Sequence, residues 1–249
     1  MSKDLVRSRL SAKEHAMLFA FIVRNALNII GKDAEAAIEN GVIKYGEQRG
    51  RRMAKRVLKD GEELSLLNYL VYGEWVPYEA SEMDIKFPHL VPELNMVAHK
   101  CSWYDCWNKK DMLEEGKYYC KHVDAALARG FREDLDLDLI SNRTEGAEKC
   151  DFYFREEAFN EKDLEEVNRR KKILNGLAIK PWDYHIAHIF NSMKDSLIKY
   201  HGRLGEKVIE ESLRDYEKEF GKETLEILME YNNTDFESID DYKDSKNKF

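Results

Sequence analysis

Two kinds of hydrophobic periodicity divide this chain of 249 residues into helical ends and a strand-forming centre. A capping-box pattern at Ser11 and Glu14 precedes apolar residues at helical spacing, and helical patterns return over 183–231. Between about 83 and 154, apolar residues alternate with polar ones in short runs, which is typical of half-buried strands. The patterns predict an α+β fold in which a small antiparallel sheet of about four strands is flanked by N- and C-terminal helices.

Four short segments carry the strand pattern in the centre of the chain. They are 83–87, 94–98, 135–140 and 150–154. A turn around Gly146 joins the last two, so we expect them to form an antiparallel hairpin. Helical patterns separate the second strand from the third, the first of them with Ser102 as its expected cap.

Chain length and composition favour one compact domain. With 43% hydrophobic residues, the chain can bury one sizeable core, and we expect a single domain over 1–231. Residues 232–249 are mostly polar, and we expect a frayed tail there.

Charge and hydropathy exclude several classes of partner. The net charge of −8 argues against a nucleic-acid partner, which usually requires a clustered basic surface. The apolar run from Ala16 to Val23 is too short to span a bilayer, and the charged N-terminus lacks the apolar core of a signal peptide. We therefore expect a cytoplasmic protein without a membrane partner, in which the cysteines stay reduced.

The four cysteines lie within one 50-residue stretch that also carries a carboxylate at helical spacing. Cys120 and Asp124 are four residues apart, so they share a helix face, and Cys101 and Cys150 lie at the ends of expected strands. A carboxylate disfavours a neighbouring thiolate unless a cation is present. The residues leave open a zinc site of Cys101, Cys120 and Cys150, catalytic roles for Cys120, Asp124 and Cys150, or plain core packing, which we expect for Cys106.

Two histidines form a second candidate group. His185 and His188 fall in the first turns of a helix that follows Pro181, so they present one face. A helix N-terminus favours neutral imidazole, which acts as a base or a ligand. We expect both to face the same cavity as the thiols. The alternative is that they are half-buried histidines in an aromatic patch with Trp182 and Tyr184.

A basic run from Arg49 to Arg56 is the densest supply of positive charge near these groups. Most of the run fits a solvated helix face. The sharper hypothesis is that Arg49 or Arg52 binds a substrate carboxylate through a bidentate contact. Trp103 is a candidate for the pocket wall or for the core.

Five segments in one order resemble the L-2-amino-thiazoline-4-carboxylic acid hydrolase family. They are YGEQRGRRMA, VAHKCSWYDCW, YYCKHVDAALARGF, EGAEKCDFYF and DYHIAHIF. The resemblance implies a hydrolase that opens a small cyclic amidine-type heterocycle by attack of activated water, with His185, His188 or Asp124 as the base. It also implies a small-molecule substrate.

The same order of strand, turn, cysteine and aromatic strand is also similar to small-molecule-binding domains of the vinyl-reductase type. Such a module would hold a structural cysteine-rich site and have no catalysis. The sequence leaves the choice of metal, with zinc as the candidate, and a homo-oligomeric state open.

Overall fold

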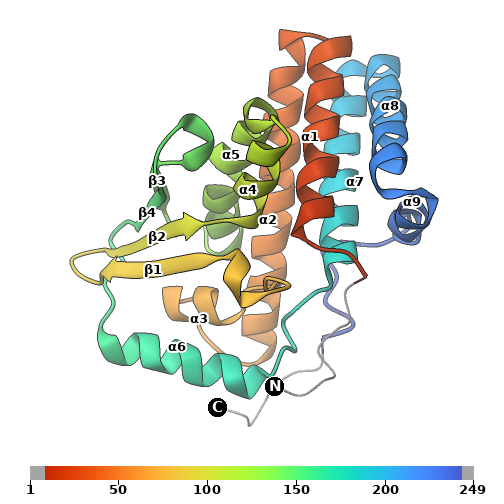
Figure 1. Ribbon diagram of the computed structural model, residues 1–249. Helices are drawn as coiled ribbons and strands as arrows, with labels where there is room; N and C mark the ends of the chain where they lie inside the picture. The colour runs from red at the N-terminus through yellow and green to blue at the C-terminus, as the bar shows by residue number, and fades with distance from the viewer. Residues whose placement is uncertain (1–8, 243–249) are drawn as a thin grey trace.

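The computed structural model describes residues 9–242, and within this range the chain forms nine α-helices and one four-stranded antiparallel sheet (Figure 1). The predicted α+β class is confirmed. The helices are α1 (Ala12–Ile29), α2 (Glu35–Lys59), α3 (Leu66–Val71), α4 (Ser102–Lys109), α5 (Leu113–Phe131), α6 (Glu161–Leu174), α7 (Trp182–His201), α8 (Arg203–Phe220) and α9 (Lys222–Met229). The strands are β1 (Asp84–His89), β2 (Leu94–Lys100), β3 (Leu137–Ser141) and β4 (Cys150–Phe154).

The first helix begins where the sequence predicts. The Ser11 hydroxyl accepts a hydrogen bond from the Lys13 amide, and the Glu14 carboxylate accepts one from the Ser11 amide at 2.8 Å. These contacts satisfy amide groups that have no partner within the helix. The capping box is therefore confirmed, and the apolar face of α1 is buried.

The sheet has the strand order β1-β2-β4-β3, and each neighbouring pair is antiparallel. Phe154 lies opposite Leu94 on one side and Leu137 on the other, which confirms the predicted hairpin of β3 and β4. Cys150 lies opposite Ala98. This register brings the start of β4 close to the end of β2, where the chain continues to Cys101.

Close contact between α2 and α5 depends on glycine. A Cβ atom added to Gly50 would lie 2.2 Å from the carbonyl oxygen of Leu127, and one added to Gly46 would lie 2.7 Å from the Cβ atom of Ala126. Only glycine permits this separation of the two backbones. Figure 1 shows α5 between α2 and the sheet, so the contact sets the distance from the basic run on α2 to the thiols.

Two hydrophobic clusters form the core. The first lies among the long helices and includes Phe19 and Ile189, and the second lies between the sheet, α3 and α6 and includes Phe152. Helix α2 contributes to both clusters, with Val42 in the first and Val57 in the second. The helical bundle and the sheet are therefore joined along the length of α2.

Helix α6 occupies a charged stretch in which the sequence patterns predict no helix. Only Val167 and Leu174 are buried on it, so its apolar periodicity is weak. Its start has a capping box, in which the side chains of Asn160 and Asp163 accept hydrogen bonds from each other's backbone amides.

The expected helix over 206–231 is divided in two at Gly221, whose φ of 86° breaks the helical backbone.

The expectation of a frayed tail is wrong for residues 232–242. Phe236 and Tyr242 are buried, and the Tyr242 carbonyl accepts a hydrogen bond from Lys59 at 2.7 Å. These two aromatic side chains bury enough apolar surface to hold the segment in place, although most of its residues are polar. The remaining tail, 243–249, and the charged N-terminus, 1–8, lie outside the described residues.

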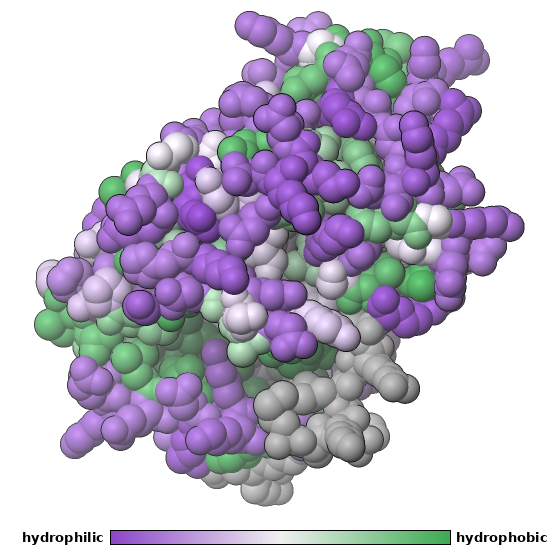
Figure 2. Space-filling view, viewed as in Figure 1, coloured by the Kyte–Doolittle hydropathy of each residue, from purple (hydrophilic) through white to green (hydrophobic). Residues whose placement is uncertain are grey.

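The surface in Figure 2 is mostly hydrophilic, and an apolar hollow interrupts it between the β1–β2 hairpin and α6. An open groove of about 640 Å³ lies between the end of α3 and the segment after α6, with Val71, Trp75 and Leu174 in its wall. In residues 9–242, none of the helices has the length and apolar character needed to cross a membrane.

Candidate functional site

A partly enclosed cavity of about 220 Å³ lies between the sheet and α5, with walls that are largely apolar and aromatic. Apart from Tyr119, the lining residues that can ionise or form side-chain hydrogen bonds through an amide are Arg49, Cys101, Cys120, Asp124, Asn142 and Cys150. The three cysteines come from a strand end, a helix and a strand start, and they line the cavity together with Asp124. Cys106 does not line it and packs against the helical cluster, as expected.

The three thiols of the cavity are held in their neutral form. Burial raises the pKa of Cys101 to about 11, although the amides of Trp103 and Tyr104 at the start of α4 oppose this. Cys101, rather than the expected Ser102, is the N-cap residue of α4. Burial also raises the pKa of Cys150, and it raises that of Cys120 well above its ordinary value. Because the thiolate is the reactive form, these raised pKa values give no sign of an activated nucleophile among the three cysteines.

The predicted zinc site finds no support in this arrangement. Among residues 9–242, no group of three or more histidine, cysteine, aspartate or glutamate side chains is placed to hold a metal ion. In the described residues, the three cysteines and Asp124 share the cavity wall without forming such a group.

Asp124 provides a carboxylate with an unusual environment. It lies one turn after Cys120 on α5 and lines the cavity. Burial raises its pKa to about 6, while the positive charge of Arg49 opposes this effect. A carboxylate with this pKa is ionised at neutral pH and still basic enough to take a proton from water.

Arg49 supplies the positive charge of the same cavity. Its side chain is buried, and its Nε atom lies 3.5 Å from the Glu74 carboxylate, too far for a good hydrogen bond. Within the described chain, this Nε has no hydrogen-bond partner. The Arg49 side chain also lines the cavity, where a guanidinium is a suitable contact for a ligand carboxylate.

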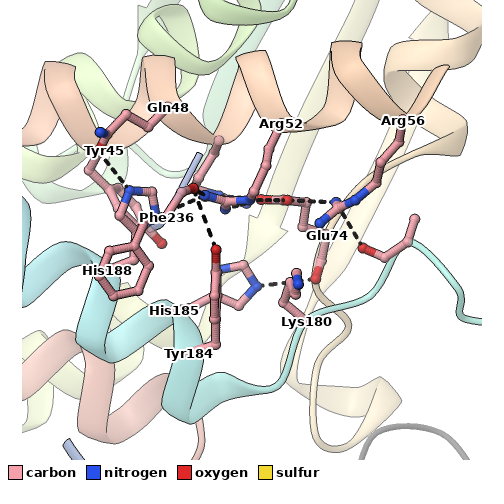
Figure 3. A network of polar contacts seen from close by, with 12 residues as sticks. Tyr45, Gln48, Arg52, Arg56, Glu74, Lys180, Tyr184, His185, His188 and Phe236 are labelled. Atoms are coloured by element: carbon pink, nitrogen blue, oxygen red, sulfur yellow. Dashed lines mark hydrogen bonds and ion pairs between the residues drawn. The ribbon is translucent and has the colours of Figure 1, made fainter. Parts of the chain in front are cut away.

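Behind the cavity, Glu74 organises a buried ionic network (Figure 3). Its carboxylate accepts hydrogen bonds from Arg52 at 2.6 and 2.7 Å and from Arg56 at 2.7 Å. Burial disfavours the charged form of Glu74, but the charges of Arg52 and Arg56 outweigh it and hold its pKa well below the usual range. This carboxylate is therefore ionised, and it fixes the arginine side chains in place.

The network corrects two site predictions. Arg52 does not line the cavity, because its guanidinium is bound to Glu74 and to the Phe236 carbonyl. His185 and His188 do not line it either, contrary to the expectation that they share it with the thiols. Sequence spacing placed the residues on the correct helices but did not reveal which face of each helix meets the cavity.

Both histidine rings are neutral, and each donates a hydrogen bond through its Nε2 atom. The His188 Nε2 donates to the Gln48 side-chain oxygen at 2.9 Å, and its Nδ1 faces Arg52 at 3.4 Å. His185 Nε2 donates to the Glu74 carbonyl at 3.1 Å. Burial lowers the pKa of His185 to about 3 and that of His188 well below its ordinary value. The rings therefore have the expected neutral form, with burial rather than the helix N-terminus as the main cause.

Several residues of the site escape the sequence analysis. Glu74 is fully buried, and its only signal is its position as one acidic residue in the apolar segment YLVYGEW. Tyr119 and Asn142 line the cavity, but tyrosine and asparagine are common on many surfaces. Trp103 lies in the cavity wall, which is one of the two locations expected for it.

Comparison with family models finds one match over residues 11–154, which is more than half of the chain. The matched model describes L-2-amino-thiazoline-4-carboxylic acid hydrolase. The matched range contains Arg49, Asp124 and all three thiols of the cavity, and it ends before α7, which carries the two histidines. Comparisons with curated proteins and with solved structures find no match. The chain therefore belongs to the L-2-amino-thiazoline-4-carboxylic acid hydrolase family.

Proposed function

We propose that this protein hydrolyses a small carboxylated heterocycle of the 2-aminothiazoline-4-carboxylate type and opens the ring at the amidine carbon. The observation that carries the proposal is that Asp124 and Arg49 both line one apolar cavity. The cavity volume of about 220 Å³ is below that of typical drug-sized ligand sites and suits a single small ring.

In the proposed reaction, the ionised Asp124 takes a proton from water as the water oxygen attacks C2 of the ring. The C2–O bond forms, and the electron pair of the C=N bond moves to nitrogen. The ring nitrogen then takes the proton from Asp124. The C2–S bond breaks as the hydroxyl oxygen on C2 forms the C=O bond and releases its proton, and sulfur leaves as a thiolate that takes up that proton. The product is an N-carbamoyl cysteine. A thiol with a pKa of about 8.5 is a good leaving group, so the main requirement is a base for water.

Substrate binding in the proposal depends on charge and aromatic contact. Arg49 binds the ring carboxylate through its guanidinium from the cavity wall, and Trp103 and Tyr119 form the aromatic wall beside the ring. The water-poor surroundings strengthen this ion pair relative to one at the surface. The cysteines enclose the ring as neutral, apolar groups and are not nucleophiles.

Ring opening releases a free thiol, which gives a direct assay. The purified protein is incubated with 2-aminothiazoline-4-carboxylate, and thiol is measured with a chromogenic disulfide. Arg49→Gln should raise KM ten- to a hundredfold, since loss of a charge-assisted hydrogen bond costs about 1.5–3 kcal/mol. The same substitution should leave turnover of 2-aminothiazoline, which lacks the carboxylate, unchanged.

Arg51→Gln is the matched control. Arg51 lies on the same helix, but it is half-exposed and pairs with Glu237 at the surface. Its replacement should leave KM for both compounds unchanged. Absence of thiol release by the wild-type protein would contradict the proposed reaction, and would leave a binding module without catalysis as the remaining hypothesis. Equal effects of Arg49→Gln on both compounds would contradict the assignment of Arg49.

A further inference from the structure

One tryptophan belongs to the walls of two spaces of different size. The cavity of about 220 Å³ and the open groove of about 640 Å³ both have Trp75 in their lining. Among residues 9–242, no other residue lines both spaces. The Trp75 side chain is half-buried and packs against the helical cluster of the core. Its indole therefore forms the partition between the cavity and the groove.

The backbone on both sides of Trp75 is bound to α7. The Glu74 carbonyl oxygen accepts a hydrogen bond from His185 Nε2 at 3.1 Å. The Val76 carbonyl oxygen accepts one from the Trp182 indole nitrogen at 3.2 Å. Because the chain is held immediately before and after Trp75, the partition is a fixed wall and not a mobile lid.

Two further tryptophans pack against the Trp75 ring. Its centroid lies 5.2 Å from that of Trp103, with an interplanar angle of 72°, and 5.6 Å from that of Trp182. The centroids of Trp103 and Trp182 lie 5.3 Å apart. These are the separations of favourable aromatic pairs. Since Trp103 also lines the cavity, the three rings give the cavity a packed aromatic wall on the side of the groove.

The two spaces differ in the ligands that they could hold. The cavity suits a single small ring, whereas the volume of the groove lies within the range of about 300–1,000 Å³ that is typical of drug-sized ligands. The groove wall is mostly apolar, with Val71, Leu174 and Ile179 among its residues. A ring in the cavity that carried a phenyl group would find apolar space for it in the groove, but the Trp75 indole stands in the way.

We propose that Trp75 is a specificity-determining residue, which restricts the cavity to ring carboxylates that carry no bulky apolar substituent. The inference rests on the proposed function and narrows its substrate class. Arg49 binds the carboxylate of such a ring, and Trp75 excludes compounds whose substituent extends towards the groove. A tightly packed ring does not move aside without losing its aromatic contacts, so the exclusion is steric.

Equilibrium binding of three stable compounds tests the proposal. They are thiazole-4-carboxylate, 2-phenylthiazole-4-carboxylate and 5-phenylthiazole-4-carboxylate, in which the two phenyl positions direct the substituent to different sides of the ring. These aromatic rings lack the amidine carbon that the proposed reaction attacks, so calorimetry measures Kd without turnover. Wild-type protein should bind thiazole-4-carboxylate and should bind both phenyl compounds more weakly.

Removal of the partition should reverse this preference. In Trp75→Ala, the ratio of Kd for at least one phenyl compound to Kd for thiazole-4-carboxylate should fall about ten- to a hundredfold, the factor that burial of one phenyl group supplies. Trp75→Leu keeps an apolar side chain of intermediate size, and it should give an intermediate ratio. This second variant decides the question if Trp75→Ala does not fold, as judged by circular dichroism.

Val76→Ala is the matched control. Val76 follows Trp75 in the chain and lines the groove but not the cavity, so its replacement widens the groove without removing the partition. The Kd ratios of this variant should equal those of wild type. An unchanged ratio in the folded Trp75 variants, or equal binding of all three compounds by wild type, would overturn the proposal.

The thiol-release assay separates this inference from the proposed function. If wild type releases no thiol from 2-aminothiazoline-4-carboxylate but the Kd ratio changes as expected, the proposed reaction fails and the selection of ligand size stands. If thiol is released but the ratio is the same in the Trp75 variants, the reaction stands and the role of Trp75 fails. Absence of thiazole-4-carboxylate binding by wild type would also overturn the inference.

Discussion

Replacing Asp124 by asparagine should stabilise the folded protein while it abolishes the proposed chemistry. The folded pKa of Asp124 is about 6, against an ordinary value of 3.8. Each pH unit of this difference corresponds to about 1.4 kcal/mol, so keeping Asp124 ionised lowers the free energy of unfolding by about 3 kcal/mol. An amide of the same shape avoids that cost. Loss of the base should lower kcat about 10²- to 10⁴-fold.

The sign of the effect fixes its pH dependence. Below the unfolded pKa, the carboxyl group is neutral in both states, so wild type and Asp124→Asn should be equally stable. As pH rises through the interval between 3.8 and about 6, the unfolded state loses its proton first, and wild type loses stability relative to the variant. Above about pH 6 the difference reaches its full value.

Urea unfolding followed by circular dichroism measures the difference. The variant and wild type are compared at about pH 4 and pH 7.5, with Glu115→Gln as a control because Glu115 lies on the same helix but not in the cavity wall. The control should show no such pH dependence. A stability difference that is equal at the two pH values, or a variant that is less stable at pH 7.5, would refute the reasoning.

Two further predictions concern the scaffold. Gly50→Ala should lower the free energy of unfolding by at least about 1–3 kcal/mol, since its Cβ would lie 2.2 Å from the Leu127 carbonyl oxygen. Gly73→Ala, whose nearest contact is at 3.9 Å, should change stability little, and equal thermal shifts would contradict this account. Glu74→Gln should cost about 3–5 kcal/mol because it leaves Arg52 and Arg56 buried without a counter-charge, and denaturant unfolding near neutral pH would show whether it does.

Sequence patterns among neighbouring residues are sufficient to predict much of the secondary structure. The capping box at Ser11 and the alternating pattern of β3 and β4 involve neighbours in the sequence, so local patterns predict them correctly. Helix α6 and the docked residues up to Tyr242 escape these rules. Their stability comes from contacts with distant segments, such as the bond from Lys59 to the Tyr242 carbonyl.

The candidate site divides in the same way. Helical spacing predicted that Cys120 and Asp124 share a face, and strand ends predicted that Cys101 and Cys150 approach them. Spacing does not determine which face of α7 meets the cavity, and in the structure neither His185 nor His188 lines it. A period of 3.6 residues defines a helix face but not its neighbour.

By itself, the sequence determined the identity of most secondary-structure elements, the family and the helix face of Asp124. The tertiary structure decided which charges meet. It bound Arg52 and Arg56 to Glu74 through hydrogen bonds and placed Arg49, whose Nε lies 3.5 Å from the same carboxylate, in the cavity wall, although all three arginines belong to one helical run. The reason is that ion pairing and burial depend on distances between segments far apart in the chain, which are set when α2 packs against α5 and α7.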